Sequence, residues 1–153
     1  MEQFIGKDGT KLFLVSDAEF NDLLEDYLSS VPESEWPKYL RDQKQTIFKL
    51  TGLGYFPNGM TTPDNLIYIR YKYRGDTELL AHEYGHVLGL DHTEKASIMN
   101  AVTHMRFFDP HDLERKAEAN FPELWRKYVV PREAYQNIVV SGIAAMALWA
   151  FII

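Results

Sequence analysis

Two histidines and a glutamate lie close together in the segment Thr77–Met99, TELLAHEYGHVLGLDHTEKASIM. His82 and His86 are four residues apart, so on a helix both imidazoles project from one face and can bind one divalent ion. Glu83 lies about 100° further round such a helix. That position is poor for a third ligand, but it suits a carboxylate that takes a proton from a metal-activated water.

A glycine three residues after His86 predicts where this helix ends. Gly89 accepts the positive φ that a helix stop usually requires, and the turn would return His92 to the same ion. Three neutral imidazole nitrogens and one water form the open tetrahedral site of a catalytic zinc. Three of the five histidines fall within eleven residues. Background frequencies give a chance match on the order of one in 10⁵ for a chain of this length.

The stretch from His82 to His92, HEYGHVLGLDH, resembles the long zinc-binding motif of the metzincin metallopeptidases, H-E-x-x-H-x-x-G-x-x-H. Gly85, Leu88 and Leu90 are similar to the matrixin version of that motif. Ser97-Ile98-Met99 resembles the Met-turn that follows it in this family. The close resemblance covers about residues 66 to 100.

The resemblance implies a zinc-dependent endopeptidase with one catalytic ion. Glu83 would be the general base, Gly89 would end the helix, and Met99 would form a hydrophobic floor beneath the metal ligands His82, His86 and His92. Plain core packing is the alternative role for Met99. A peptide or protein substrate would lie extended along the strand Leu66–Tyr73 and pair with its backbone. Residues 100–103 would wall the pocket for the residue after the scissile bond.

Other features of the family are not matched. Matrixins typically hold a second, structural zinc and structural calcium, but only His104 and His111 remain to ligate a second zinc, and both follow the motif. The second zinc is therefore expected to be absent, and the sequence gives no support for calcium. Astacins and serralysins place a tyrosine shortly after the Met-turn, where this chain has Asn100-Ala101-Val102.

Several strands and helices are predicted to position the motif. KLFLV at Lys11–Val15 is typical of a strand, and Ser16 with Glu19 has the capping-box spacing that begins a helix. LIYIRYKY at Leu66–Tyr73 alternates as a strand does, and Asp76 or Thr77 can cap the active-site helix.

The other segments are predicted from their apolar spacing and their turn residues. We expect a helix over about 34–50, a loop over 51–65, and a helix that begins at Asp109-Pro110 and turns Leu113 and Ala117 inward. An apolar stripe then continues through Leu124, Trp125 and Tyr128.

These elements indicate an α+β fold. We expect a zincin or metzincin-like catalytic domain over residues 1–133, with a small twisted sheet, an active-site helix and a reduced upper subdomain. Residues 134–153 form a separate apolar segment, expected to be helical.

Composition excludes several classes of protein. The 153 residues have a formal net charge of −6, so no basic excess indicates nucleic-acid binding. The absence of cysteine excludes disulfides, Cys-ligated zinc, a cysteine nucleophile and an inhibitory thiol. Hydrophobic residues make up 46% of the chain, as in an ordinary globular domain.

The final sixteen residues, IVVSGIAAMALWAFII at Ile138–Ile153, carry no charge. As a helix they would reach roughly 24 Å, a short membrane span that mild thinning of the bilayer could accommodate. The alternative is a buried helix in a core or an interface. If the segment spans, Arg126, Lys127 and Arg132 favour a cytoplasmic catalytic domain.

The sequence leaves function and location open between alternatives. The alternative to the peptidase is a non-catalytic protein in which zinc only stabilises the fold. Such a protein could be membrane-anchored or virion-associated. We expect a membrane-associated protein, attached through its C-terminal segment, with the catalytic domain on the cytoplasmic side. The family resemblance instead implies a secreted enzyme, although Lys7, Asp8 and Lys11 interrupt any export signal, and a virion-associated location is a further alternative. The cleavage preference and the oligomeric state are not indicated.

Overall fold

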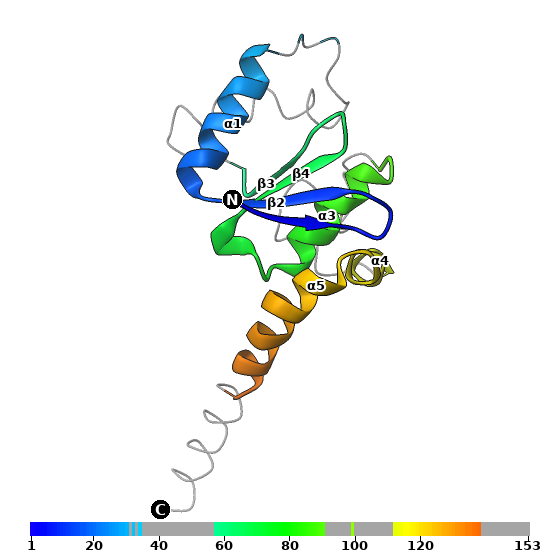
Figure 1. Cartoon of the computed structure of the whole chain (residues 1–153). Coiled ribbons are helices and arrows are strands. Elements are labelled where there is room, and N and C mark those ends of the chain that lie inside the picture. The colour runs from blue at the N-terminus through cyan, green and yellow to red at the C-terminus, as the bar shows by residue number, and fades with distance from the viewer. Residues whose placement is uncertain (31, 33, 35–56, 91–98, 100–111, 139–153) are drawn as a thin grey trace, which may run out of the picture.

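The computed structural model describes residues 1–30, 32, 34, 57–90, 99 and 112–138. In chain order they form β1 (Glu2–Ile5), β2 (Lys11–Val15), α1 (Asp17–Ser30), β3 (Gly59–Thr61), β4 (Leu66–Arg70), a 3₁₀ turn (Tyr71–Tyr73), α3 (Thr77–Val87), α4 (Asp112–Asn120) and α5 (Pro122–Leu124). A π-helical turn (Trp125–Val129) follows α5, and helix continues to residue 138. This α+β arrangement agrees with the predicted class (Figure 1).

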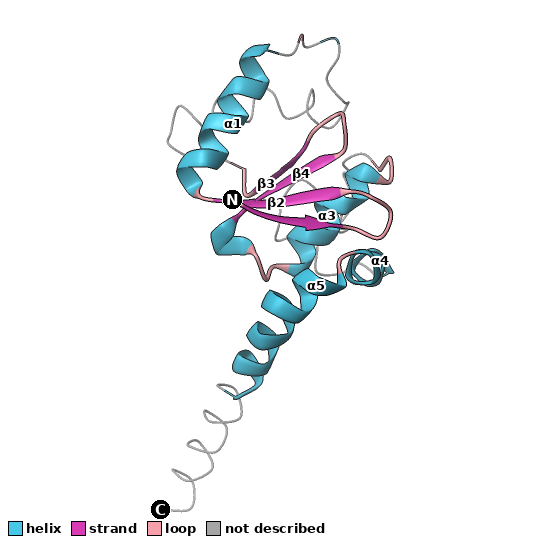
Figure 2. Cartoon of the chain, viewed as in Figure 1, coloured by secondary structure: helices cyan, strands magenta, loops and turns pink. Residues whose placement is uncertain are grey.

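The four strands form one mixed sheet in the order β1-β2-β4-β3. β1 and β2 are an antiparallel hairpin, β2 and β4 run parallel, and β3 is antiparallel to β4. The parallel pair is connected through α1, as a parallel pair requires a crossover (Figure 2).

Alternate residues of the strands face two separate cores. Leu12 and Leu14 of β2 pack with α3 and α4 on one face of the sheet. Val15 packs with α1 on the other face, together with Phe20, Leu24 and Met60. The sheet therefore lies between α1 and α3, and the residues of α3 that face it are buried.

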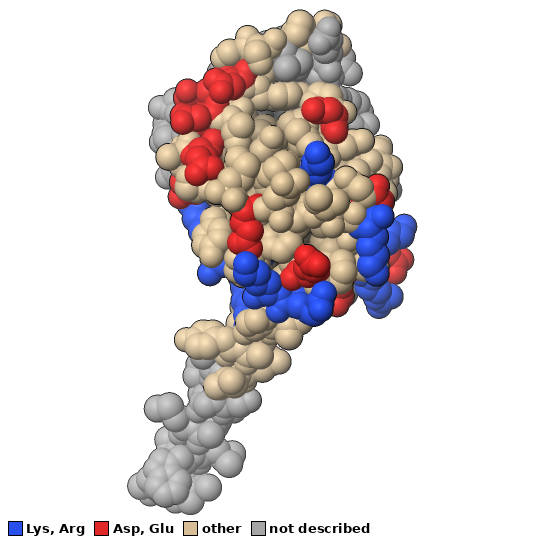
Figure 3. Space-filling view, viewed as in Figure 1, with Lys and Arg blue, Asp and Glu red and all other residues tan. Residues whose placement is uncertain are grey.

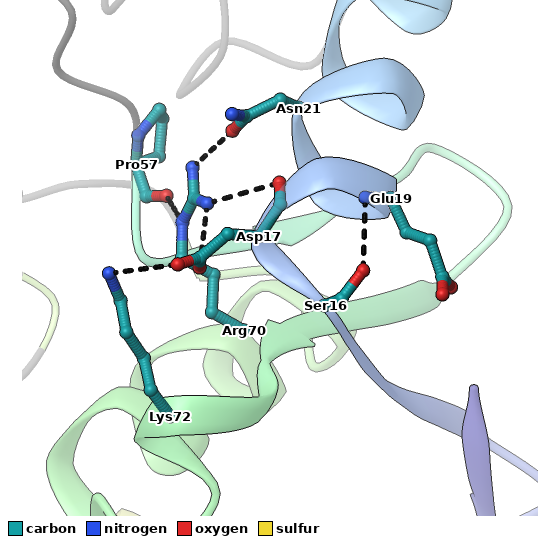
Figure 4. Close-up of polar contacts among 7 residues, drawn as sticks. All are labelled: Ser16, Asp17, Glu19, Asn21, Pro57, Arg70 and Lys72. Carbon is teal, nitrogen blue, oxygen red and sulfur yellow. Dashed lines mark hydrogen bonds and ion pairs between the residues drawn. The ribbon is translucent and has the colours of Figure 1, made fainter.

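Arg70, at the end of β4, connects that strand to α1 and to the chain that enters β3 (Figure 4). Its guanidinium donates to the Pro57 carbonyl at 2.8 Å, to the Asp17 carboxylate at 3.0 Å and to the Asn21 side chain at 2.7 Å. The same group lies 4.3 Å from the centre of the Phe20 ring. The charge of this buried arginine is thus neutralised and hydrogen-bonded, as burial requires.

Several local predictions are confirmed. β2 has the predicted bounds, and the Ser16 hydroxyl accepts a hydrogen bond from the Glu19 amide at 3.2 Å, where α1 begins. Leu113 and Ala117 of α4 are buried as expected. The predicted helix over 34–50 and the helix start at Asp109-Pro110 fall almost wholly outside the described residues, and so does the region of the expected reduced upper subdomain.

The prediction for Leu66–Tyr73 is wrong in two respects. The strand ends at Arg70, and Tyr71–Tyr73 form a 3₁₀ turn in which the Arg74 amide donates to the Tyr71 carbonyl at 3.1 Å. The chain must turn here to begin α3, so the strand ends even though the alternating pattern of residues continues to Tyr73. β4 also has strand partners on both sides, so its backbone is occupied and a substrate strand cannot pair with it.

Two short strands were missed. β1 forms a hairpin with β2 through a turn at which Gly9 has φ +87° and the Thr10 amide donates to Asp8 Oδ1 at 2.9 Å. β3 lies within the segment predicted as loop. Among the described strands, β3 is the edge strand next to β4.

The C-terminal helical stretch, residues 122–138, extends away from the sheet (Figure 1). Leu124, Trp125 and Val129 are buried against the body, whereas every residue from 130 to 138 is exposed. No helix within the described ranges has both the length and the apolar character that a membrane crossing needs. Residues 139–153, and with them most of the predicted apolar helix, lie outside the described residues.

Candidate metal centre

The helix α3 begins at the predicted cap. The Asp76 side chain accepts a hydrogen bond from the Leu79 amide at 3.1 Å, which satisfies one of the free donors of the first turn. All eight residues from Leu79 to His86 are buried. Two histidines and a glutamate in the middle of such a helix therefore lie away from bulk water.

His82 and His86 are brought together as their spacing predicts. Their Nε2 atoms lie 3.2 Å apart, and the rings are nearly perpendicular at 88°. Two nitrogens bound to one tetrahedral zinc at about 2.05 Å each would lie about 3.3 Å apart. The pair therefore fits a shared ion, although the same distance also allows His82 to donate to His86 without one.

The outer nitrogen of His86 shows which ring nitrogen is available for a metal. Its Nδ1 lies 2.7 Å from the carbonyl oxygen of Leu90, an acceptor, so Nδ1 carries the proton. The neutral ring then has a lone pair on Nε2, the atom that faces His82. An outer hydrogen bond of this kind orients many metal-binding histidines.

Glu83 is held by a residue that the sequence analysis missed. The Thr61 hydroxyl, on β3, donates to Glu83 Oε2 at 2.6 Å and lies 3.0 Å from the Glu83 carbonyl oxygen. Both side chains are buried, with 1% of Thr61 and 5% of Glu83 exposed. The carboxylate therefore has a defined orientation beside the histidine pair.

The end of α3 follows the predicted turn. Gly89 has φ +90°, and the Leu90 amide donates back to the Gly85 carbonyl at 3.0 Å. This pattern is typical of a helix that ends on a left-handed glycine. It directs the chain back toward the helix just before His92, which lies outside the described residues together with His104, His111 and residues 100–103.

Met99 packs directly against α3. It is buried, and a Cβ added to Gly85 would lie 2.4 Å from its sulfur and 2.9 Å from Leu113 Cδ2. The floor position that the family resemblance implied and ordinary core packing are both compatible with this contact. In either case Gly85 is required for the close approach.

The opposite side of α3 is fixed to the β1–β2 turn. Tyr84 donates its hydroxyl proton to Asp8 Oδ2 at 2.8 Å, and the Asp8 amide donates to the Asn120 side chain at 3.0 Å. Burial, together with this hydrogen bond to a carboxylate, raises the pKa of Tyr84 to about 12. Although partial burial acts to raise the pKa of Asp8, hydrogen bonds from Thr10 and Tyr84 lower it overall. Helix α3 is thus anchored to the β1–β2 turn on the side of Tyr84.

Within ranges 1–30, 57–90 and 112–138 and at Met99, no three His, Asp or Glu side chains gather in a metal-binding arrangement. Since His92 lies outside these ranges, the described part of the site consists of two imidazoles and one carboxylate. No described cluster offers a calcium site.

A separate open hollow of about 490 Å³ lies at the start of α1. Its walls come from the first strand, the beginning of the helix and the turn after β4: Met1, Glu2, Leu14, Ser16, Asp17, Glu19, Tyr71 and Lys72. Ser16 caps α1, and Asp17 pairs with Arg70 and with Lys72. These polar groups hold the helix in place, so the hollow is explained by the fold.

Comparisons of the chain with protein-family models, with curated proteins and with solved structures gave no match. The assignment below therefore depends on the residues and their geometry.

Proposed function

We propose that this chain is a zinc-dependent endopeptidase. The observation that carries the proposal is the convergence of His82 Nε2 and His86 Nε2, 3.2 Å apart, beside the buried carboxylate of Glu83. His92 is proposed as the third ligand, because Gly89 turns the chain back at the position that the long metzincin-like motif requires. The finer fold assignment, a zincin or metzincin-like domain, is part of the same proposal.

The proposed chemistry divides between the ion and the chain. A zinc ion would act as a Lewis acid, lowering the pKa of a water toward about 7 and polarising a peptide carbonyl. Glu83 accepts the proton of the attacking water and then delivers it to the leaving amine. His86 is kept in the ligating tautomer by the Leu90 carbonyl. Burial of α3 excludes competing water from these steps.

We also propose β3 in place of β4 as the strand that a substrate peptide would meet. β3 is the last described strand on its side of the sheet, and its residue Thr61 contacts Glu83 directly. A peptide added as a strand there would have its backbone near the proposed base.

Replacing Glu83 by glutamine tests the mechanism. The amide keeps the size of the side chain but cannot accept the proton, so we expect one zinc per chain to remain while peptide cleavage falls by about 10²- to 10⁴-fold. Zinc is measured by elemental analysis and cleavage by mass spectrometry of a mixed peptide library. Glu118→Gln, on the exposed face of α4, is the matched control. Undiminished cleavage in Glu83→Gln would contradict the mechanism.

The rival proposal is a zinc site that only stabilises the fold. Glu83 argues against it, since a structural site does not need a carboxylate beside its ligands and usually fills its fourth position with protein. The library assay separates the two functions: wild-type chain with stoichiometric zinc and no turnover would favour the structural role.

A second proposal concerns location. The exposed helix over residues 130–138 leads directly into the uncharged sequence that ends at Ile153, and a lipid bilayer is the partner we propose for that sequence. Arg126 and Lys127, in the π-helical turn, and Arg132, on the exposed helix, precede the apolar sequence. Charged side chains gather where the helix leaves the body (Figure 3). The catalytic domain is proposed to lie on the cytoplasmic side. Secreted and virion-associated locations remain the alternatives.

A further inference from the structure

We infer that Thr61 is a positioning residue for Glu83, and that β3 sets the direction in which this carboxylate accepts a proton. The inference rests on the proposed function and deepens it, because it assigns the control of the general base to a strand outside the zinc motif. Thr61 itself is not proposed to touch substrate or metal.

The contact between the two side chains is short and buried. An O–H···O distance of 2.6 Å is typical of a hydroxyl that donates to a charged carboxylate. A threonine hydroxyl has a single proton, and the Glu83 carbonyl, at 3.0 Å, lies inside α3, where the helix ordinarily supplies its donor. The Thr61 hydroxyl therefore donates its proton to the Glu83 carboxylate and not to the Glu83 carbonyl.

Gly59 supplies a second, independent constraint. It is two residues before Thr61 on β3, so the two residues face the same side of the sheet. A Cβ added at Gly59 would lie 3.2 Å from Glu83 Cγ and 2.9 Å from Ile69 Cδ1. The glycine thus lets α3 approach the strand closely enough for the hydrogen bond, and it leaves the glutamate stem little room to move toward β3.

Together these contacts fix the orientation of the Glu83 carboxylate from outside α3, because Oε2 accepts from Thr61 and the side-chain stem lies against Gly59. A buried carboxylate that loses its donor must find another partner, and a base displaced by about 1 Å can lose about 10²-fold in rate. Fixing Glu83 from outside its own helix is therefore a means of controlling the rate.

Two substitutions at one position test the inference. Thr61→Val keeps the shape of the side chain and removes the hydroxyl, whereas Thr61→Ser keeps the hydroxyl. With zinc content equal to wild type, we expect Thr61→Val to lower kcat by about 10- to 100-fold with KM changed less than about 3-fold. Thr61→Ser should recover most of the rate, and this rescue separates positioning from a general effect on folding.

A readout without activity is provided by crystal structures of the zinc-free chain. In Thr61→Val the Glu83 carboxylate should move away from residue 61 of β3. The distance between His82 Nε2 and His86 Nε2 should stay as in wild type. An unchanged carboxylate, or equal kcat in the valine and serine variants, would overturn the inference. If the wild-type chain with bound zinc cleaves no peptide, the proposed function fails, and the crystal structures alone decide whether Thr61 orients Glu83.

Discussion

Gly85 lies where α3 passes closest to Met99, and its missing side chain makes that contact possible. An added Cβ would come within 2.4 Å of the Met99 sulfur and 2.9 Å of Leu113 Cδ2. Two separate parts of the chain, Met99 and Leu113 of α4, therefore meet the same face of the helix. Packing against Met99 and Leu113 thus requires a glycine at position 85.

We expect Gly85→Ala to destabilise the folded chain by about 1–3 kcal/mol, because the added methyl overpacks a filled site. The free energy of unfolding in urea, measured with and without zinc, checks this. Glu118→Ala, an exposed substitution on α4, should change stability by less than about 0.5 kcal/mol. A Gly85→Ala chain as stable as wild type would show that Met99 and Leu113 can move away.

Some single residues were predictable because their signals are local. The positive φ of Gly89 and the cap at Asp76 follow from residue type and from distance to the helix ends. Thr61 could not be found in this way, since it contacts Glu83 across 22 positions of sequence. Nothing in the residues around Thr61 distinguishes it from an ordinary strand threonine.

Besides the apolar packing of Phe20 and Leu24, ion pairs hold helix α1 to the sheet at its first turn, where Asp17 meets Arg70 and Lys72. The hydrogen bond from Arg70 is the largest influence on the Asp17 carboxyl, and it outweighs burial and lowers the pKa. An acidic residue at this end is also favoured by the helix dipole. The ion pairs that connect α1 to β4 should therefore weaken at low pH.

The sign of that dependence follows from the lowered pKa of Asp17. The unfolded chain, with an ordinary carboxyl, takes up protons first, so the stabilisation is present above about pH 4 and is lost as pH falls through the folded-state pKa. We expect Asp17→Asn to be less stable than wild type at pH 7 by at most about 1 kcal/mol, since the side chain is 53% exposed. Urea unfolding at pH 7 and pH 3 should show the gap closing in acid.

The matched control is Asp22→Asn, an exposed substitution on the same helix. It should leave the pH dependence of unfolding unchanged. A stability gap for Asp17→Asn that is as large at pH 3 as at pH 7 would mean that the carboxylate charge does not hold α1 in place.

Strands with a long apolar pattern were predicted. Strands that are short and defined mainly by a turn or by their pairing partner were missed. β2 and β4 have strong patterns and lie in the interior of the sheet. β1 is recognisable only through the Asp8-Gly9 turn, and three-residue β3 only through its pairing with β4. The false extension arose because Tyr71–Tyr73 continue the alternation of the strand in sequence. In the structure Tyr71 instead packs against Arg74 and Tyr128.

The described part of the molecule consists of a body and a projecting helix that is attached to the body at its base. The Tyr128 hydroxyl lies 2.8 and 2.6 Å from the two carboxylate oxygens of Glu2 and donates its one proton to the nearer, Oε2. The Tyr128 ring meets Phe4 and Tyr71 edge to face. Val129 is the last buried residue. Four residues separate it from Ala134, where the uncharged sequence begins, and the rise from Val129 to Ala134 is roughly 7.5 Å of helix. A bilayer around that sequence would lie close to the body.

If the uncharged sequence inserts into lipid, the full chain should float with phosphatidylcholine vesicles in a density gradient. A chain that ends after Tyr135 keeps every buried contact of the helix and should stay at the bottom of the gradient. Equal flotation of the two chains, or none by either, would contradict membrane attachment. Circular dichroism of both chains shows whether the shorter one is folded.

The proposed peptidase requires three imidazoles to hold one zinc ion, with a fourth position open beside Glu83. A crystal structure of the zinc-loaded chain, with anomalous data at the zinc edge, would show the ion and its ligands. We expect one ion bound by the Nε2 atoms of His82, His86 and His92, with a water in the fourth position. An ion bound elsewhere, His92 far from the pair, or a protein side chain in the fourth position would contradict the peptidase assignment.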